Sequence, residues 1–69
     1  MSKPLFTIGN NIKKYRDKLG ISQSKLSKIT GINLYTITKI EFGATSDPRI
    51  ETLKKIADGL GVSVDDLIK

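Results

Sequence analysis

The chain has 69 residues, 38% of them hydrophobic, which suits one small domain with a modest core. It contains no cysteine and no histidine, which excludes a disulfide framework, a thiolate metal site, a cysteine nucleophile and the commonest general base. Residues 1–42 hold eight basic and two acidic side chains, whereas residues 43–69 hold four basic and five acidic ones. The net charge of +5 therefore comes from the first part. This asymmetry indicates either a polyanionic partner on one side of the fold or a solvated surface.

Apolar residues recur at helical spacing in the first segment, which predicts a helix from about Thr7 to Leu19. Thr7 is its expected N-cap and Gly20 its expected end. Gly9, in the first turn, weakens the helix slightly. The expected inward stripe is Ile8, Ile12, Tyr15 and Leu19.

A second, shorter helix is predicted over residues 23–30, with Ser22 as its N-cap. Leu26 and Ile29 are its expected inward residues. Gly31 ends it, because glycine adopts the left-handed conformation at little cost.

The third helix is predicted from about Leu34 to Glu41 or Phe42, with Asn33 as its cap. Its β-branched residues give it a mediocre helix propensity, so the stretch taken alone also suits a strand. The cap and the three-residue spacing of Ile37 and Ile40 favour the helix.

A fourth helix is predicted to begin at Asp47-Pro48, with the aspartate as cap and the proline in the first helical position. Gly59 and Gly61 mark its expected end. Its expected inward stripe is Ile50, Leu53, Ile56, Ala57 and Leu60.

Ser63 is the expected cap of a last short helical turn, with Asp65 and Asp66 near its positive end and Leu67 facing inward. The expected fold class is therefore all-α, a compact bundle of five helices in a single domain spanning residues 1–69. No stretch approaches the roughly 20 apolar residues that span a bilayer, and the start MSKPLF lacks the apolar core of a secretory signal. We therefore expect a cytoplasmic protein that does not contact membranes.

Two short helices joined by a turn with Gly31 form a helix-turn-helix pattern over about residues 22–43. The run LGISQSKLSKITGINLYTITKIEFG, residues 19–43, resembles the helix-turn-helix of the phage repressor and Cro family, also called the XRE family. The resemblance covers about residues 7–68 and implies a lambda-repressor-like fold and a sequence-specific DNA-binding regulator, expected to be a repressor. The matching residues are Leu19-Gly20, Ser22-Gln23, Leu26, Gly31-Ile32, Ile37, Ile40-Glu41 and Gly43.

The resemblance also implies roles for single residues on double-stranded DNA. Gln23 matches a glutamine that binds phosphate and braces the recognition helix, with an ordinary exposed glutamine as the alternative. Arg16 and Glu41 match an ion pair between the first and third helices, with two separately solvated charges as the alternative. The positions implied to contact bases are Leu34, Tyr35, Thr38 and Lys39. For Lys39, a phosphate contact is the alternative. The positions implied to contact phosphates are Gln23, Asn33, Thr36, Arg16 and Lys28. Lys13, Lys14 and Lys25 join Lys28 as general attractors of phosphate, and plain solvation is the more frequent state of any one such lysine.

The sequence departs from the family pattern at three positions. Leu34 and Tyr35 stand where polar residues are usual, so we expect recognition of thymine methyl groups and DNA shape in an A·T-leaning site. Phe42 stands where a side chain usually contacts phosphate, which leaves only the backbone amides of Phe42 and Gly43 for that contact. These apolar residues also motivate an alternative function, an antitoxin-like protein-interaction module with little or no base readout.

Operators are usually read by dimers, so we expect weak homodimerisation through the C-terminal helices. The apolar residues expected at that surface are Val62, Val64, Leu67 and Ile68. We expect no enzyme activity, because Ser22, Ser24 and Ser27 have no histidine to activate them, and no metal, cofactor or small-molecule ligand is evident.

Overall fold

The computed structural model describes residues 4–43 and 49–69, and over these ranges it contains five helices and no strand. The predicted all-α class and number of helices are confirmed. The predicted helix start at Asp47-Pro48 lies outside the described residues. The helices are α1 (Pro4–Leu19), α2 (Gln23–Thr30), α3 (Leu34–Phe42), α4 (Ile50–Leu60) and α5 (Val64–Ile68).

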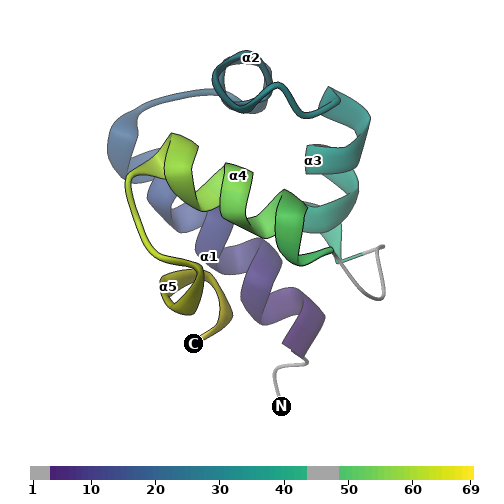
Figure 1. The fold of residues 1–69 in the computed structure, drawn as a ribbon, viewed down its shortest axis with the longest axis vertical. Coiled ribbons are helices and arrows are strands. Elements are labelled where there is room, and N and C mark those ends of the chain that lie inside the picture. The colour runs from purple at the N-terminus through teal and green to yellow at the C-terminus, as the bar shows by residue number, and fades with distance from the viewer. Residues whose placement is uncertain (1–3, 44–48) are drawn as a thin grey trace.

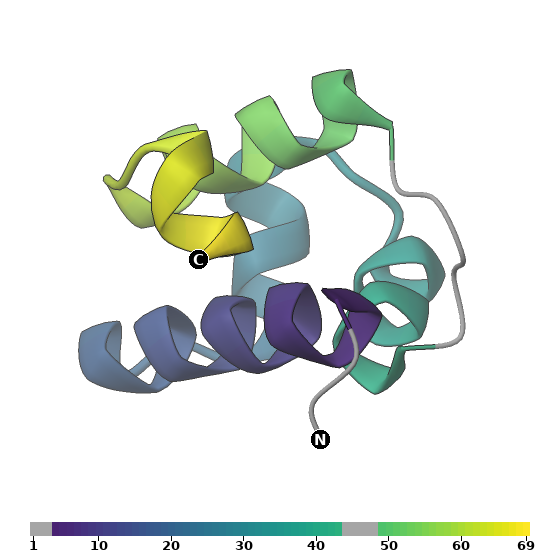
Figure 2. The same cartoon turned by 90° about the horizontal axis from the view of Figure 1, so that it is seen from below.

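The helices pack around one hydrophobic core (Figure 1). Helix α1 packs against α3, α4 and α5, and α2 packs against α3 and α4. Figure 2 shows α1 along one side of the molecule and α4 with α5 along the other, with α2 connecting the two sides. The buried core draws on every helix and consists of Ile12, Leu26, Ile37, Ile40, Leu53, Ile56, Ala57, Leu60 and Leu67.

Side-chain caps set the starts of the short helices, as the sequence predicts. The Ser22 hydroxyl accepts from the amide of Lys25 at 3.0 Å, and Asn33 Oδ1 accepts from the amide of Tyr35 at 2.7 Å. Ser63 caps α5 with Asp66 in a reciprocal capping box. Gly31 ends α2 in the left-handed region at φ 74°, which turns the chain toward α3.

The predicted start of the first helix is wrong. Helix α1 begins at Pro4, so Thr7 lies inside it and is not its N-cap. Proline suits the first turn because its fixed φ is helical and its missing N–H has no partner there. Helix α4 ends at Leu60 with Gly61 as its left-handed C-cap, as the sequence predicts, whereas Gly59 lies inside the helix. A Cβ on Gly59 would lie 2.6 Å from Thr30 Cγ2. Gly59 therefore allows α2 and α4 to approach closely.

Some residues predicted to face inward are exposed. Ile29 is 49% exposed although one of its methyl groups lies close to Gly59 of α4. Leu19 and Ile50 are exposed because they are the last residue of α1 and the first of α4, where fewer neighbours surround a side chain. Conversely, Leu67 is fully buried in the core and is not part of the apolar surface expected at the C-terminal helices.

Gly9 explains how α1 and α3 pack so closely. A Cβ on Gly9 would lie 2.6 Å from the carbonyl oxygens of both Ile40 and Glu41. The backbone of α1 thus passes directly against the last turn of α3. This contact holds the C-terminal end of α3 in place.

Candidate nucleic-acid interface

The Glu41 carboxylate joins three helices at one point. Its side chain is only 5% exposed. From α1, Arg16 Nε donates to Oε2 at 2.9 Å and Arg16 Nη2 donates to Oε1 at 3.1 Å. From α2, Gln23 Nε2 donates to Oε1 at 3.0 Å. The ion pair predicted between Arg16 and Glu41 is present, and both α1 and the start of α2 are fixed to α3 through it.

Gln23 is also bonded to the exposed face of α3. Thr38 Oγ1 lies 3.0 Å from Gln23 Oε1, and the hydroxyl must be the donor because an amide oxygen only accepts. The bond from Nε2 to Glu41 fixes which way round the amide lies. Gln23 therefore keeps one unused amide hydrogen, and Thr38 keeps only its acceptor lone pairs for an external partner.

Arg16 is committed to bracing the fold. Its side chain is 12% exposed, and Nη1 donates to the carbonyl of Ile21 at 2.9 Å in addition to the two bonds to Glu41. The hydrogen bond to Glu41 is the largest of the effects that raise the pKa of Arg16 above its usual value, so the guanidinium stays charged. The phosphate contact expected for Arg16 stays a prediction, with two of its five N–H groups left to make it.

The recognition-helix candidates lie on the outer face of α3. Tyr35 is 70% exposed, Leu34 and Thr38 are also exposed, and Thr36 is half-buried. The ammonium of Lys39 lies 5.3 Å from the centre of the Tyr35 ring. A single surface of α3 thus presents an aliphatic side chain, a phenol, a hydroxyl oxygen and a cation.

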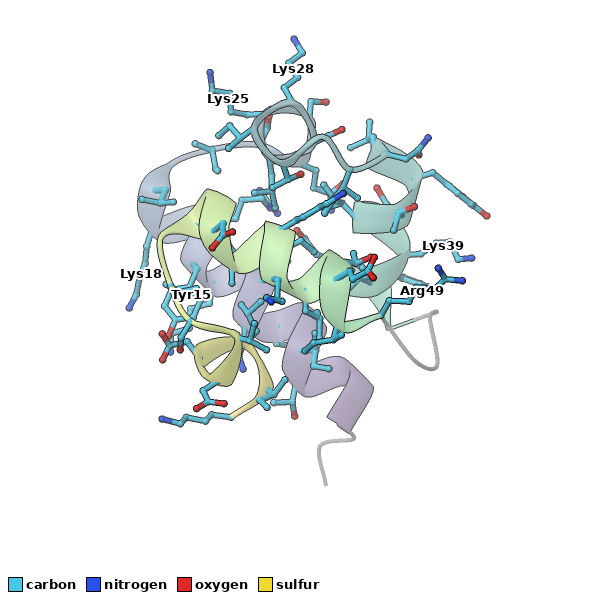
Figure 3. All side chains as sticks on the ribbon, in the orientation of Figure 1. Tyr15, Lys18, Lys25, Lys28, Lys39 and Arg49 are labelled. Carbon is cyan, nitrogen blue, oxygen red and sulfur yellow. The ribbon has the colours of Figure 1, made fainter. Side chains whose placement is uncertain are left out.

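The other predicted phosphate contacts are spread over neighbouring elements. In Figure 3, Lys25 and Lys28 extend outward from α2, whereas Lys39 extends to another side from α3. Asn33 uses its Oδ1 to cap α3, so only its amide nitrogen is free to donate to a phosphate. Each role stays a prediction.

A hollow of about 300 Å³ opens where α1, α2 and α3 meet. Phe42 on its rim is 77% exposed. The Gly43 amide, expected as a phosphate donor, instead donates to the carbonyl of Ile40 at 3.1 Å and closes the end of α3. The lining residues are Lys13, Arg16, Gln23, Thr38, Glu41 and Phe42.

Two polar side chains that the sequence analysis did not single out anchor the ends of helices. The Asn11 amide donates to the carbonyls of Leu67 at 2.8 Å and Lys69 at 3.1 Å, which ties α1 to the end of α5. Thr30 Oγ1 donates to the carbonyl of Leu26 at 2.8 Å and accepts from the amide of Ile32 at 3.2 Å within the turn between α2 and α3. Only the packing of distant segments reveals the role of Asn11.

Within residues 4–43 and 49–69, no helix is long and apolar enough to cross a membrane. No three or more of their His, Cys, Asp and Glu side chains gather closely enough to hold a metal ion.

The sequence profile of a family described as Helix-turn-helix matches residues 12–67, which include α2, the turn and α3. The chain belongs to the helix-turn-helix family. The helix-turn-helix regulator SinR of Bacillus subtilis is 36% identical over 61 residues, and the chain spans 55% of its length. A glutamine–fructose-6-phosphate aminotransferase of Methanocaldococcus jannaschii is 34% identical over 62 residues, covering 90% of the chain but 6% of that protein. So small a share does not extend the aminotransferase activity to this helix-turn-helix chain.

Solved structures share the fold. A crystal structure of SinR, described as the master regulator for biofilm formation in complex with DNA, superposes with a TM-score of 0.86 at 35% identity. It covers 90% of this chain and 98% of that one. A hypothetical transcription factor from Neisseria superposes with a TM-score of 0.91 at 21% identity, covering 97% of this chain and 76% of that one, which shows the fold alone.

Proposed function

We propose that this chain is a sequence-specific DNA-binding transcriptional regulator, a repressor that inserts α3 into the major groove of an operator. The observation that carries the proposal is the geometry of α3. Its outer face presents Leu34, Tyr35 and Thr38, while Glu41 fixes its inner side to α1 and α2. SinR, which is similar over nearly the whole chain, has a structure in complex with DNA. In this proposal residues 1–69 act as one helix-turn-helix domain.

The contacts in the proposed complex follow from the free groups of each side chain. Leu34 and Tyr35 pack against thymine methyl groups, which are the apolar feature of the major groove. The Thr38 hydroxyl already donates its hydrogen bond to Gln23, so it accepts a hydrogen bond from an exocyclic amine of adenine or cytosine. Lys39 and the free amide hydrogen of Gln23 bind phosphates. Asn33, Thr36, Arg16 and Lys28 complete the proposed phosphate contacts.

Selection of bound sites from a random duplex library tests the proposal directly. We expect an enriched, A·T-leaning motif, because two of the four base-reading positions are apolar. The same library selected with a Leu34→Ser, Tyr35→Ser variant should lose or change the motif while still retaining DNA through phosphate contacts. A wild-type selection that enriches no motif would contradict the proposal, and a motif dominated by guanines would contradict the methyl reading alone.

A protein-interaction module is the second candidate, because Tyr35 and Phe42 are 70% and 77% exposed on α3. Exposed aromatic rings are common at protein interfaces. A gel shift with random duplexes at low salt separates the two functions. Complete absence of binding would favour the interaction module, since even non-specific DNA binding is strong at low salt.

We propose that the regulator acts in the cytoplasm, has no catalytic role and dimerises weakly on its operator. The proposed dimer surface is narrower than the sequence suggests, because Leu67 is buried and Val62 and Val64 pack partly against the core. Ile68, which is exposed, remains. Sedimentation velocity should show dimers on an operator duplex whose half-sites lie about 34–36 Å apart. A monomer on a single half-site would contradict this part of the proposal.

A further inference from the structure

The hollow between α1, α2 and α3 has a positively charged wall and an apolar wall. Lys13 stands on the α1 side and Phe42 on the α3 side, with Arg16 and Glu41 also among the lining residues. Both wall residues are exposed to solvent. A phosphodiester chain has the same alternation, since each charged phosphate is followed by a deoxyribose with an apolar face.

We propose that this hollow binds one segment of DNA backbone, with Lys13 contacting the phosphate and the Phe42 ring covering the adjacent deoxyribose. The inference rests on the proposed function and adds a defined backbone site to it. Neither residue is part of the base-reading face of α3, so the contact would hold on any DNA sequence.

The charges in the hollow point to Lys13 as the phosphate ligand. Arg16 and Glu41 neutralise each other at 2.9 Å, so they add no net charge to the hollow. Lys13 has no carboxylate partner among the ion pairs of residues 4–43 and 49–69. The lining therefore carries one uncompensated positive charge, and it belongs to Lys13.

Phe42 supplies the apolar half of the contact. The ring has no group that could bind a phosphate, but its 77% exposure leaves most of its surface available to a sugar. Because position 42 carries no charge, the cation for this backbone segment has to come from α1. The residue pair thus combines a charge from α1 with an apolar cover from α3.

Lys18 provides a matched control. It lies on the same helix as Lys13 but does not line the hollow, and its ammonium lies 5.5 Å from the centre of the Tyr15 ring. Replacing either lysine by alanine removes the same charge from the same exposed helix. Only the position relative to the hollow differs.

The test measures the affinity for a labelled random-sequence duplex by fluorescence anisotropy over a KCl series. We expect Lys13→Ala to make the slope of log affinity against log salt shallower by about 0.9, the value for one lost phosphate contact. Lys18→Ala should leave the slope near that of the wild type. Phe42→Ala should weaken binding several-fold at every salt concentration with an unchanged slope. Phe42→Lys should steepen the slope by about 0.9.

Equal slopes for the two lysine variants, or wild-type affinity of Phe42→Ala, would overturn the inference while leaving the proposed function intact. Failure of the wild-type chain to bind any duplex would overturn both. Circular dichroism of each variant verifies that it is folded, which the exposure of all three residues leads us to expect.

Discussion

The carboxylate of Glu41 accepts two hydrogen bonds from Arg16, at 2.9 and 3.1 Å, across the junction of α1 and α3. Such a two-pronged arginine–carboxylate pair fixes orientation as well as distance. Gly9 brings the two backbones close enough for it, and Gln23 extends it to α2. The orientation of α3 relative to α1 and α2 is thus set at its C-terminal end by one charged residue.

Glu41→Gln should therefore reduce stability and DNA affinity together. The amide nitrogen of a glutamine would face N–H donors of Arg16 or Gln23, and Arg16 would lose its counter-charge. Removing one partner of a buried ion pair costs about 3–5 kcal/mol, and we expect the lower part of that range because Arg16 is partly exposed. Urea denaturation and duplex affinity measure the two effects, with exposed Glu51→Gln as the matched control. A variant unchanged in both would show that the pair does not set the orientation of α3.

The bond between Thr38 and Gln23 should make these two residues energetically coupled in DNA binding. Thr38→Val removes the hydroxyl that holds the Gln23 amide, and Gln23→Ala removes the amide itself. Because both changes break the same hydrogen bond, we expect a coupling energy of about 0.5–1.5 kcal/mol in a double-mutant cycle on duplex affinity. Thr38→Ser keeps the hydroxyl and should bind like the wild type. Strictly additive losses of binding free energy would show that the two residues act independently.

The elements of the fold follow from local signals in the sequence. Ser22, Asn33 and Ser63 are predicted caps, and each accepts the hydrogen bond that a cap requires. Cap chemistry acts within a few residues, so a linear pattern reveals it. The start of α1 escaped prediction because Thr7, a common cap residue, directly precedes Ile8, whereas Pro4 begins the helix itself.

The site was less predictable because its contacts join distant segments. The Arg16–Glu41 pair could be expected only from the family resemblance, since 25 residues separate the partners. The resemblance implied that Gln23 braces the recognition helix, but nothing indicated Thr38 as its partner. Nor did any pattern indicate that Lys13 and Phe42 would face one hollow. Helix periodicity gives the face of a residue on its own helix, but the crossing of two helices decides which faces meet.

Gly9→Ala should destabilise the fold although alanine is the better helix former. The gain in helix propensity is about 1 kcal/mol, but the new Cβ would lie 2.6 Å from two carbonyl oxygens of α3. Overpacking of this kind costs about 1–3 kcal/mol and more where backbone must move, so we expect a net loss. Asn10→Ala, at an exposed neighbouring position in the same helix, should be neutral or stabilising. Thermal unfolding compares the two, and a Gly9→Ala variant as stable as Asn10→Ala would refute the close approach.

The capping box at α5 predicts a small pH dependence. The backbone hydrogen bond from Ser63, followed by that from its hydroxyl, lowers the pKa of Asp66 below its usual value of 3.8. A carboxyl whose pKa is lower in the folded state stabilises the fold above its unfolded pKa, and loses that effect as pH falls through the folded pKa. NMR titration should find the pKa of Asp66 below 3.8, and Ser63→Ala should raise it only in part because the backbone bond remains. A pKa of Asp66 at or above 3.8 in the wild-type chain would contradict the box.

The apolar reading face of α3 predicts that one methyl group affects binding. If Leu34 contacts a thymine methyl in the proposed complex, replacing that thymine by uracil removes the methyl and leaves the base pairing unchanged. Burial of one such carbon is worth about 0.8 kcal/mol, which corresponds to a loss of roughly four-fold in affinity for the wild-type chain. Leu34→Ala should bind both duplexes more weakly and discriminate less between them, because its shorter side chain no longer reaches the methyl. Single uracil substitutions scanned through a selected site would locate the contact. Leu34 does not read thymine if every uracil substitution weakens binding of the wild-type chain and of Leu34→Ala by the same factor. The exposure of Leu34 on α3 would then favour the protein-interaction alternative.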